Sequence, residues 1–255
     1  MRTYFHVRSG RAEEVKGEVV REQPLTIHVN GERFLTLLCS PFQLEALVVG
    51  YLWMERVIER LEDVAALHVS EVDGRADVTL GHRVALPTER ILTSGCGGGI
   101  TFRVDPRVFP RLNSPTRIRP ERLAARLKDL FGAAVRYRAS RGIHGAALSD
   151  GERLLVVAED VGRHNAVDKV KGEALERGLE TRDRILLSTG RISSEMLLKA
   201  ARMGVPIVAS RTSPTEMAVG LAEQLGVTIA GYVRPDSLNV YAGDGIELAP
   251  GGAGP

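Results

Sequence analysis

The stretch Arg153-Leu-Leu-Val-Val-Ala158, followed by Glu159-Asp-Val-Gly-Arg-His-Asn165, decides the fold that the sequence predicts. The first part is a short apolar run typical of a buried strand, and a helix is expected over 165–177. Upstream, Ser149-Asp-Gly151 predicts a hairpin turn that joins this strand to Gly145-Ala-Ala-Leu148. A buried strand that leads through a polar turn into a helix is the repeating unit of α/β proteins.

The same unit recurs toward the C-terminus. An amphipathic helix is expected over 121–131, and further helices are expected over 193–203 and over 213–225, the last opened by a capping box at Ser213-Pro-Thr-Glu216. The strands expected between and after them cover 184–188, 206–209, 227–233 and 238–241. This alternation predicts a three-layer α/β domain with a partly parallel sheet.

The N-terminal part has the character of an α+β domain. Residues 1–38 alternate as strands do, with runs at 18–21, 25–29 and 34–39, and Asn30-Gly31 as a hairpin turn. Ser40 as N-cap, Pro41 and Gln43 predict a capping box before a helix over 44–54 whose apolar side chains lie on one face. A second hairpin is expected from 67–69 and 76–80, around Asp73-Gly74.

The domain boundary is placed in the proline-rich segment 105–120, which contains four of the 12 prolines. The sequence therefore predicts a strand-rich N-terminal domain over 1–114 and an α/β domain over 115–250. The glycine-rich end, 251–255, is expected to be a disordered tail.

Composition and charge exclude several classes of protein. The chain has 255 residues, 44% hydrophobic and 26% charged, which is ordinary for a soluble globular protein. A net charge of +2 does not indicate a nucleic-acid partner, and no apolar run is long enough to span a membrane. Two cysteines, Cys39 and Cys96, cannot supply a disulfide framework or a four-ligand zinc site, so no metal is expected and a reducing cytoplasm is the expected location.

The two cysteines lie in different settings. Cys39 ends an apolar run and is expected to be buried and inert. Cys96 lies in Thr93-Ser-Gly-Cys-Gly-Gly-Gly99, where small neighbours leave the sulfur accessible and glycine N–H groups could stabilise a thiolate. The alternative is a plain linker whose cysteine is incidental.

Three polar turns follow expected strands. They are 159–165, Ser188-Thr-Gly-Arg-Ile-Ser-Ser-Glu195 and Arg211-Thr-Ser213. At one sheet edge they would form a continuous crevice that suits an anionic ligand. The alternative for the first turn is a helix start capped by Asp160 or Asn165, with a surface ion pair between Asp160 and Arg163.

The sequence lacks the motifs of several classes of enzyme. The sequence lacks the G-x-G-x-x-G and Walker loops, and also the H-x-E and P-C-x-x-C motifs of zinc deaminases. His144 and His164 could each assist a thiol as base or donor, yet no local signature of a cysteine–histidine hydrolase accompanies them.

One motif stands out along the chain, the run from Glu159 to Val170. Further motifs are Ser40-Pro41, Thr93 to Gly97, His144 to Leu148, Gly190 to Glu195, Gly204 to Ser210 and Asn239 to Tyr241. Together and in this order along the chain, they resemble the motifs of one family, the formate dehydrogenase accessory sulfurtransferases (FdhD family).

The resemblance implies a sulfur carrier. Such a protein takes sulfur from a cysteine desulfurase as a persulfide, here on Cys96, and passes it to the molybdenum cofactor in its bis-guanine-dinucleotide form, for formate dehydrogenase. It further implies a homodimer, a C-terminal domain similar to cytidine deaminase without zinc, and contact with the cofactor through Tyr232, Val233, Arg234, Pro235, Asp236 and Ser237.

One position departs from the family pattern. A second cysteine commonly stands three positions after the first, and this chain has Gly99 there. Either one thiol suffices for sulfur carriage, or the protein is a non-catalytic chaperone of the cofactor. A thiol redox sensor is the least favoured alternative, because the loop has no resolving cysteine.

Overall fold

The fold is seen in a computed structural model of the chain, which describes residues 1–84, 90–92, 100–102 and 109–248. Of residues 90–92 and 100–102 it gives only the short strands β7 (Arg90–Leu92) and β8 (Ile100–Phe102). The expected linker over 105–108 and the tail over 251–255 lie outside the described residues. The division into domains at residue 114 stays a prediction.

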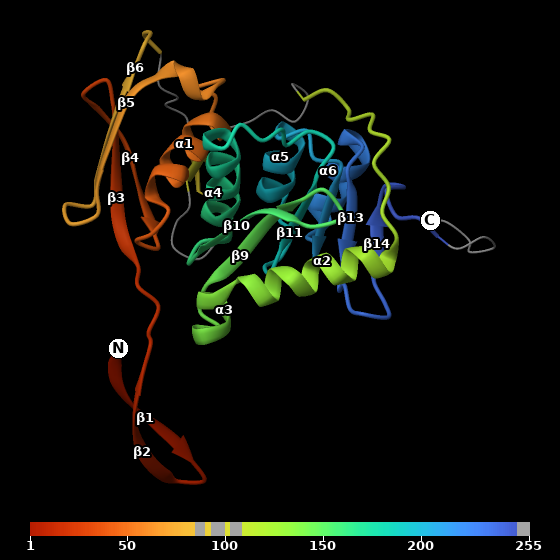
Figure 1. The fold of residues 1–255 in the computed structure, drawn as a ribbon, viewed down its shortest axis with the longest axis horizontal. Coiled ribbons are helices and arrows are strands. Elements are labelled where there is room, and N and C mark those ends of the chain that lie inside the picture. Colours follow the sequence, from red (N-terminus) through yellow and green to blue (C-terminus); the bar gives the residue numbers. More distant parts are fainter. Residues whose placement is uncertain (85–89, 93–99, 103–108, 249–255) are drawn as a thin grey trace.

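A six-stranded sheet forms the centre of the C-terminal part, in the order β10-β9-β11-β12-β13-β14 (Figure 1). The pairs β11–β12 and β12–β13 are parallel and the others are antiparallel, so the expected partly parallel sheet is confirmed. The strands are β9 (His144–Ser149), β10 (Leu154–Asp160), β11 (Ile185–Ser188), β12 (Ile207–Ser210), β13 (Thr228–Gly231) and β14 (Asn239–Ala242).

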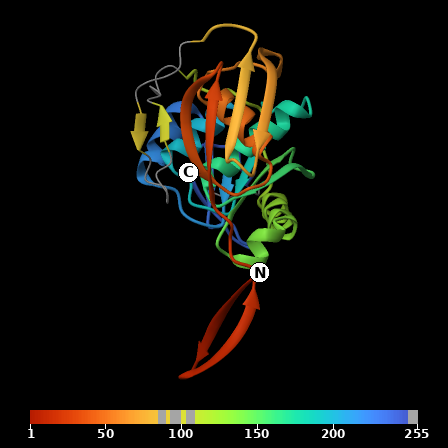
Figure 2. The same cartoon turned by 90° about the vertical axis from the view of Figure 1, so that its left-hand side faces the viewer.

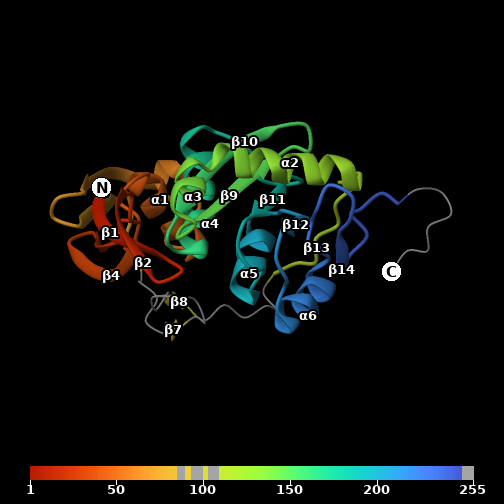
Figure 3. The ribbon, with the colours of Figure 1, turned by 90° about the horizontal axis from the view of Figure 1, so that it is seen from below.

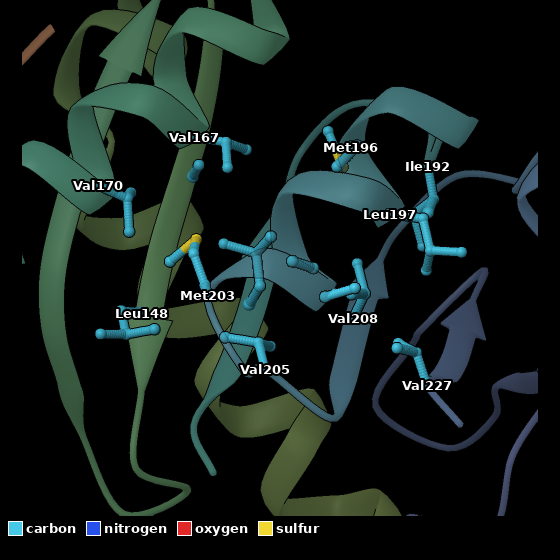
Figure 4. Close-up of a cluster of buried hydrophobic side chains, with 14 of the residues drawn as sticks. Leu148, Val167, Val170, Ile192, Met196, Leu197, Met203, Val205, Val208 and Val227 are labelled. Carbon is cyan, nitrogen blue, oxygen red and sulfur yellow. The ribbon is translucent and has the colours of Figure 1, made fainter. Parts of the chain in front are cut away.

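Helices cover both faces of this sheet, which makes three layers. Figure 3 shows α2 on one side and α5 and α6 on the other. Alternate residues of β11 take opposite sides: Leu186 packs in the cluster with α4, α5 and α6, whereas Ile185 and Leu187 pack with α2. Figure 4 shows part of the first cluster. The helices are α2 (Pro120–Ala133), α3 (Val135–Ser140), α4 (Arg163–Glu176), α5 (Ser194–Arg202) and α6 (Glu216–Leu225). The three-layer α/β prediction is therefore confirmed, and the likeness to cytidine deaminase stays a prediction.

A four-stranded sheet forms the N-terminal part, in the order β4-β3-β6-β5. Its strands are β3 (Gln23–Val29), β4 (Glu32–Cys39), β5 (Val64–Ser70) and β6 (Arg75–Leu80), with the turn η1 (Leu61–Asp63) before β5. Asn30 and Gly31 have φ values of 50° and 85°, so the predicted hairpin turn is confirmed.

The helix α1 (Leu44–Met54) has the predicted bounds but is buried on two sides. Leu47, Tyr51 and other apolar residues pack on the four-stranded sheet, as predicted. The opposite side packs on α4, where a side chain at Gly50 would overlap the carbonyl oxygen of Asp168 and one at Gly172 would overlap that of Ala46. The two helices are therefore in backbone contact.

A two-stranded hairpin, β1 (Arg2–Arg8) and β2 (Arg11–Gly17), stands away from the rest of the molecule (Figures 1 and 2). The strand predicted over 18–21 is wrong, because these residues connect the hairpin to β3 without a strand partner. Val20 instead lies against Gly142, after α3.

Two predicted helix starts are also wrong in detail. Ser40 does not cap α1, whose N-cap is Gln43 in the left-handed conformation with φ 50°. The N-cap of α6 is Thr215, not Ser213, and its Oγ1 accepts a hydrogen bond from the N–H of Ala218. Ser213 and Thr215 exchange backbone hydrogen bonds with Ile192, which holds this segment extended until Glu216.

Candidate functional site

The three polar turns singled out from the sequence lie at one edge of the six-stranded sheet. Because β10, β11 and β12 point the same way, the turns follow carboxyl ends at the same edge, with β9 between β10 and β11. The turns also touch: Ser210 Oγ, at the end of β12, donates to the carbonyl of Gly190 over 2.7 Å, and His164 Nε2 of the first turn lies 2.9 Å from Ser193 Oγ of the second. The turns therefore lie at one sheet edge as predicted, whereas the continuous crevice across them stays a prediction, because Arg211 is their only residue that lines the cavity described below.

The first turn has a structural task that the sequence did not reveal. Asp160 and Lys169 form a fully buried ion pair with 2.6 Å between Oδ2 and Nζ. The Asp160 carboxylate also accepts a hydrogen bond from the backbone N–H of Ser40, and Ser40 Oγ accepts one from the backbone N–H of Val161. The predicted surface pair between Asp160 and Arg163 is therefore wrong, and the motif fastens the β4–α1 connection to β10 and α4.

Asn165 belongs to the same junction and does not cap α4. Its side-chain amide donates to Asp160 Oδ1 over 3.0 Å and to the carbonyl of Leu38 over 2.9 Å. The helix begins earlier, at Arg163, with Gly162 as N-cap. Ser40, Asp160, Asn165 and Lys169 thus act as one joint between segments about 120 positions apart.

His164 is held on both ring nitrogens. Nε2 lies 2.9 Å from Ser193 Oγ, and Nδ1 lies 3.0 Å from Glu195 Oε2. Burial, helped by the nearby charges of Lys199 and Arg163, lowers the pKa of His164 to about 2. A neutral imidazole this hard to protonate is a poor base, so the geometry disfavours His164 as an assistant to a thiol.

His144 is the more available histidine. It begins β9 at the same sheet edge, is partly exposed, and its Nδ1 has no hydrogen-bond partner among the described residues. Burial is the main cause that lowers its pKa, followed by the charge of Arg163. The side chain lies close over Gly190, where an added Cβ would come 3.0 Å from Nδ1.

The segment over 232–237 borders a cavity of about 330 Å³ between two strand-end turns and α2. Arg234 donates its backbone N–H to the carbonyl of Ser237, which closes a turn, and its side chain donates to the carbonyl of Arg211. Tyr232 is exposed and has a φ of 50°, and Val233 is buried. Only Val233, Arg234 and Pro235 of the predicted segment line the cavity. Tyr232, Asp236 and Ser237 do not.

The remaining walls of the cavity come largely from residues that the sequence analysis did not single out. Glu121, Lys128 and Phe131 contribute from α2, and the guanidinium carbon of Arg211 lies 4.8 Å from the centre of the Phe131 ring. This volume is in the range of small-molecule sites. Three cations, one carboxylate and an aromatic ring suit a ligand that carries both phosphate and a flat ring. No signal local to 121–131 distinguishes these side chains from an ordinary solvated helix face.

Of the two cysteines, the structure describes only Cys39. Cys39 is fully buried as predicted, and burial raises the pKa of its thiol to about 12, which favours the inert interpretation. Cys96 lies outside the described residues.

Within the described ranges, no group of three or more histidine, cysteine or acidic side chains is arranged for a metal, and no helix is both long and apolar enough to cross a membrane.

Comparison with known proteins identifies relatives over nearly the whole chain. The FdhD/NarQ family model matches residues 20–246. The chain is 39% identical to the sulfur carrier protein FdhD of Bacillus subtilis (strain 168), over 94% of both chains, and 40% identical to that of Halalkalibacterium halodurans, over 88% of this chain and 86% of that one.

A solved structure is similar as well. It is a crystal structure described as that of a formate dehydrogenase accessory protein from Desulfotalea psychrophila, with a TM-score of 0.79 and 28% identity, covering 98% of this chain and 97% of the other. Sequence and structure agree, and the chain belongs to the FdhD/NarQ family.

Proposed function

We propose that this protein is a cytoplasmic sulfur carrier. It accepts sulfur from a cysteine desulfurase on Cys96 and passes it to the molybdenum cofactor, in its bis-guanine-dinucleotide form, for use by formate dehydrogenase. Sequence similarity to proteins named sulfur carrier protein FdhD supports the proposal. So does the sequence over 93–99, in which no residue beside Cys96 has a side chain larger than that of threonine.

The loading step is a thiol–persulfide exchange. The Cys96 thiolate attacks the outer sulfur of the desulfurase persulfide, a new S–S bond forms on Cys96, and the desulfurase cysteine leaves as a thiolate. Releasing that sulfur as sulfide consumes two electrons, which a further thiol must supply. Gly99 and the buried Cys39 cannot provide it, so the reducing thiol comes from another molecule.

The cavity beside residues 233–235 is the proposed binding site for the cofactor. Its lining of Lys128, Arg211 and Arg234 offers positive charge to the phosphates of the dinucleotide, and Phe131 offers a ring for a base. Two larger hollows, of about 670 and 1010 Å³, lie elsewhere and contain no residue of the 232–237 segment.

Sulfur loading of the purified protein tests the function. After incubation with a cysteine desulfurase and cysteine, the intact mass of the wild type should increase by one sulfur atom, and a reducing thiol should reverse the increase. Cys39→Ala is the matched control and should load as the wild type does. Sulfur that remains on Cys96→Ala, or its absence from the wild type, would show that Cys96 is not the carrier.

A non-catalytic chaperone of the cofactor is the second candidate, because Gly99 removes the second loop thiol. Complementation separates the two functions. A strain that lacks its own copy of this protein should regain formate dehydrogenase activity with the wild type and with Cys39→Ala. If Cys96→Ala restores the same activity, the chaperone is the correct function.

A further inference from the structure

The cavity beside α2 contains a single carboxylate, that of Glu121, together with its three cations. Other charged side chains of this helix are already paired, Arg122 with Glu152 and Arg126 with Asp129. Among the residues that the structure describes, Glu121 has no hydrogen-bond or ion-pair partner. Its two oxygens are therefore available to accept hydrogen bonds from a ligand in the cavity.

Glu121 begins the stripe of α2 that lines the cavity. The stripe continues through the alanines at 124–125 to Lys128, which is the spacing of one helix face. Lys128 follows Glu121 by two turns, about 10 Å along the helix axis. Arg211 lies on the ring of Phe131, nearly one turn further. The carboxylate and these two cations therefore lie toward opposite ends of the cavity, with small side chains between them.

This order of groups fits a nucleotide in one orientation. The phosphates belong at the end with Lys128 and Arg211, because cations attract them and the carboxylate of Glu121 would repel them. The base then extends over the small alanine side chains toward Glu121. In a dinucleotide, a second ring system lies beyond the phosphates, and Phe131 is placed to contact it.

Most of the lining does not distinguish one base from another. Cations bind phosphates, which all nucleotides share, and apolar or aromatic walls pack against the face of any base. A carboxylate is selective, because it accepts hydrogen bonds and donates none. Guanine presents two neighbouring donors, its N1–H and its 2-amino group, to such a carboxylate. Adenine presents a lone pair at N1 and cytosine one at N3, and the carboxylate repels both.

We propose that Glu121 determines the base selectivity of the cavity by accepting both donors of guanine. The inference rests on the proposed function and adds to it the residue that recognises the guanine of the cofactor. The cations supply affinity for the phosphates, and the carboxylate supplies the preference for one base. A nucleotide with adenine or cytosine leaves Glu121 desolvated without a donor, which weakens its binding.

Isothermal titration calorimetry of the full-length chain with three nucleoside diphosphates tests the selectivity. The wild type should bind guanosine diphosphate roughly tenfold or more tightly than adenosine diphosphate. Inosine diphosphate, which lacks only the 2-amino group of guanine, should bind with an intermediate affinity. In Glu121→Gln an amide group replaces one of the two acceptor oxygens, so the guanosine and adenosine nucleotides should bind with nearly equal affinity.

Two further variants are the controls. Glu216→Gln makes the same change in the first turn of α6, at a residue outside the cavity lining, and should keep the wild-type preference. Arg211→Gln should weaken the guanosine and adenosine nucleotides by the same factor, because it removes a contact to phosphate that both share.

Equal affinity of the wild type for guanosine and adenosine diphosphates would overturn the inference. So would a Glu121→Gln variant that keeps the wild-type preference, or a wild type that binds neither nucleotide. Sulfur loading of Cys96 in the wild type, followed by intact mass, requires no nucleotide. It therefore tests sulfur carriage separately from base selectivity.

Discussion

Buried charge explains why the run over 159–170 is so dense in polar side chains. Asp160 and Lys169 are both inaccessible to solvent, and a buried ion pair is tolerable only when its remaining hydrogen-bonding groups are satisfied. Ser40 supplies the N–H that Asp160 accepts, and the carbonyls of Ser40 and Glu159 accept from the lysine. The polar character of the motif thus reflects packing between distant segments as much as chemistry.

His164 gives the stability of the protein a pH dependence. Its pKa is about 2 in the folded chain and about 6.5 when unfolded, so between these values only the unfolded chain binds the proton. The free energy of unfolding should therefore fall as pH drops below 6.5, by up to about 1.4 kcal/mol per pH unit from this residue. In His164→Gln, urea unfolding between pH 6.5 and 5 should show a slope smaller by about 1 kcal/mol per pH unit.

An unchanged slope in His164→Gln would mean that the imidazole is already protonated in the folded protein. Its 3.0 Å contact with Glu195 would then be an ion pair between two charged groups.

At the scale of elements, the contact between α1 and α4 depends on two glycines. Gly50→Ala would push a methyl group into the carbonyl of Asp168, and Gly172→Ala would do the same to that of Ala46. Because these are backbone atoms in a packed core, either change should lower the free energy of unfolding by at least about 1–3 kcal/mol in urea titrations.

A glycine in open space provides the opposite case. Gly220, inside α6, has no atom within 4 Å of an added Cβ. Gly220→Ala should raise the free energy of unfolding by up to about 1 kcal/mol, through helix propensity alone. Equal effects at Gly50 and Gly220 would refute the close helix contact.

Most elements could be predicted from the sequence, because their periodicity and turn residues are local signals. The hairpin around Asp150 and the bounds of α1 are examples. The helix starts at Ser40 and Ser213 could not be predicted, since each serine segment is held by a partner remote in sequence: Val161 for Ser40 and Ile192 for Ser213. A capping motif reports local preference, and here tertiary hydrogen bonds override it.

At the scale of the whole molecule, the candidate substrate cavity is assembled from three separate segments. The sequence indicated Arg211 and the stretch over 232–237, but not the part of α2 that faces them. The alternation of strands and helices shows which turns lie at one sheet edge. It does not show which helix of another layer packs beside that edge, and for this the tertiary fold is needed. Lys128 and Phe131 therefore became candidates only with the structure.

Guanosine diphosphate, a fragment of the proposed substrate, can probe that cavity. Arg211→Gln removes a guanidinium from the wall and should weaken binding roughly tenfold or more in isothermal titration calorimetry. Arg138→Gln, on α3 and outside the cavity lining, should bind as the wild type does. Equal affinity of Arg211→Gln and wild type, or no binding by the wild type, would place the nucleotide elsewhere.

The joint around Ser40 has a consequence during synthesis of the chain. Helix α1 and the end of β4 depend on partners near residues 160–172, so their buried surfaces stay uncovered while about 120 further residues are made. At translation rates of about 5–20 residues per second, that interval lasts roughly 6–24 s. The side of α1 that packs on α4, with Gly50, stays uncovered throughout it, so the nascent chain should be a chaperone client until α4 has left the ribosome.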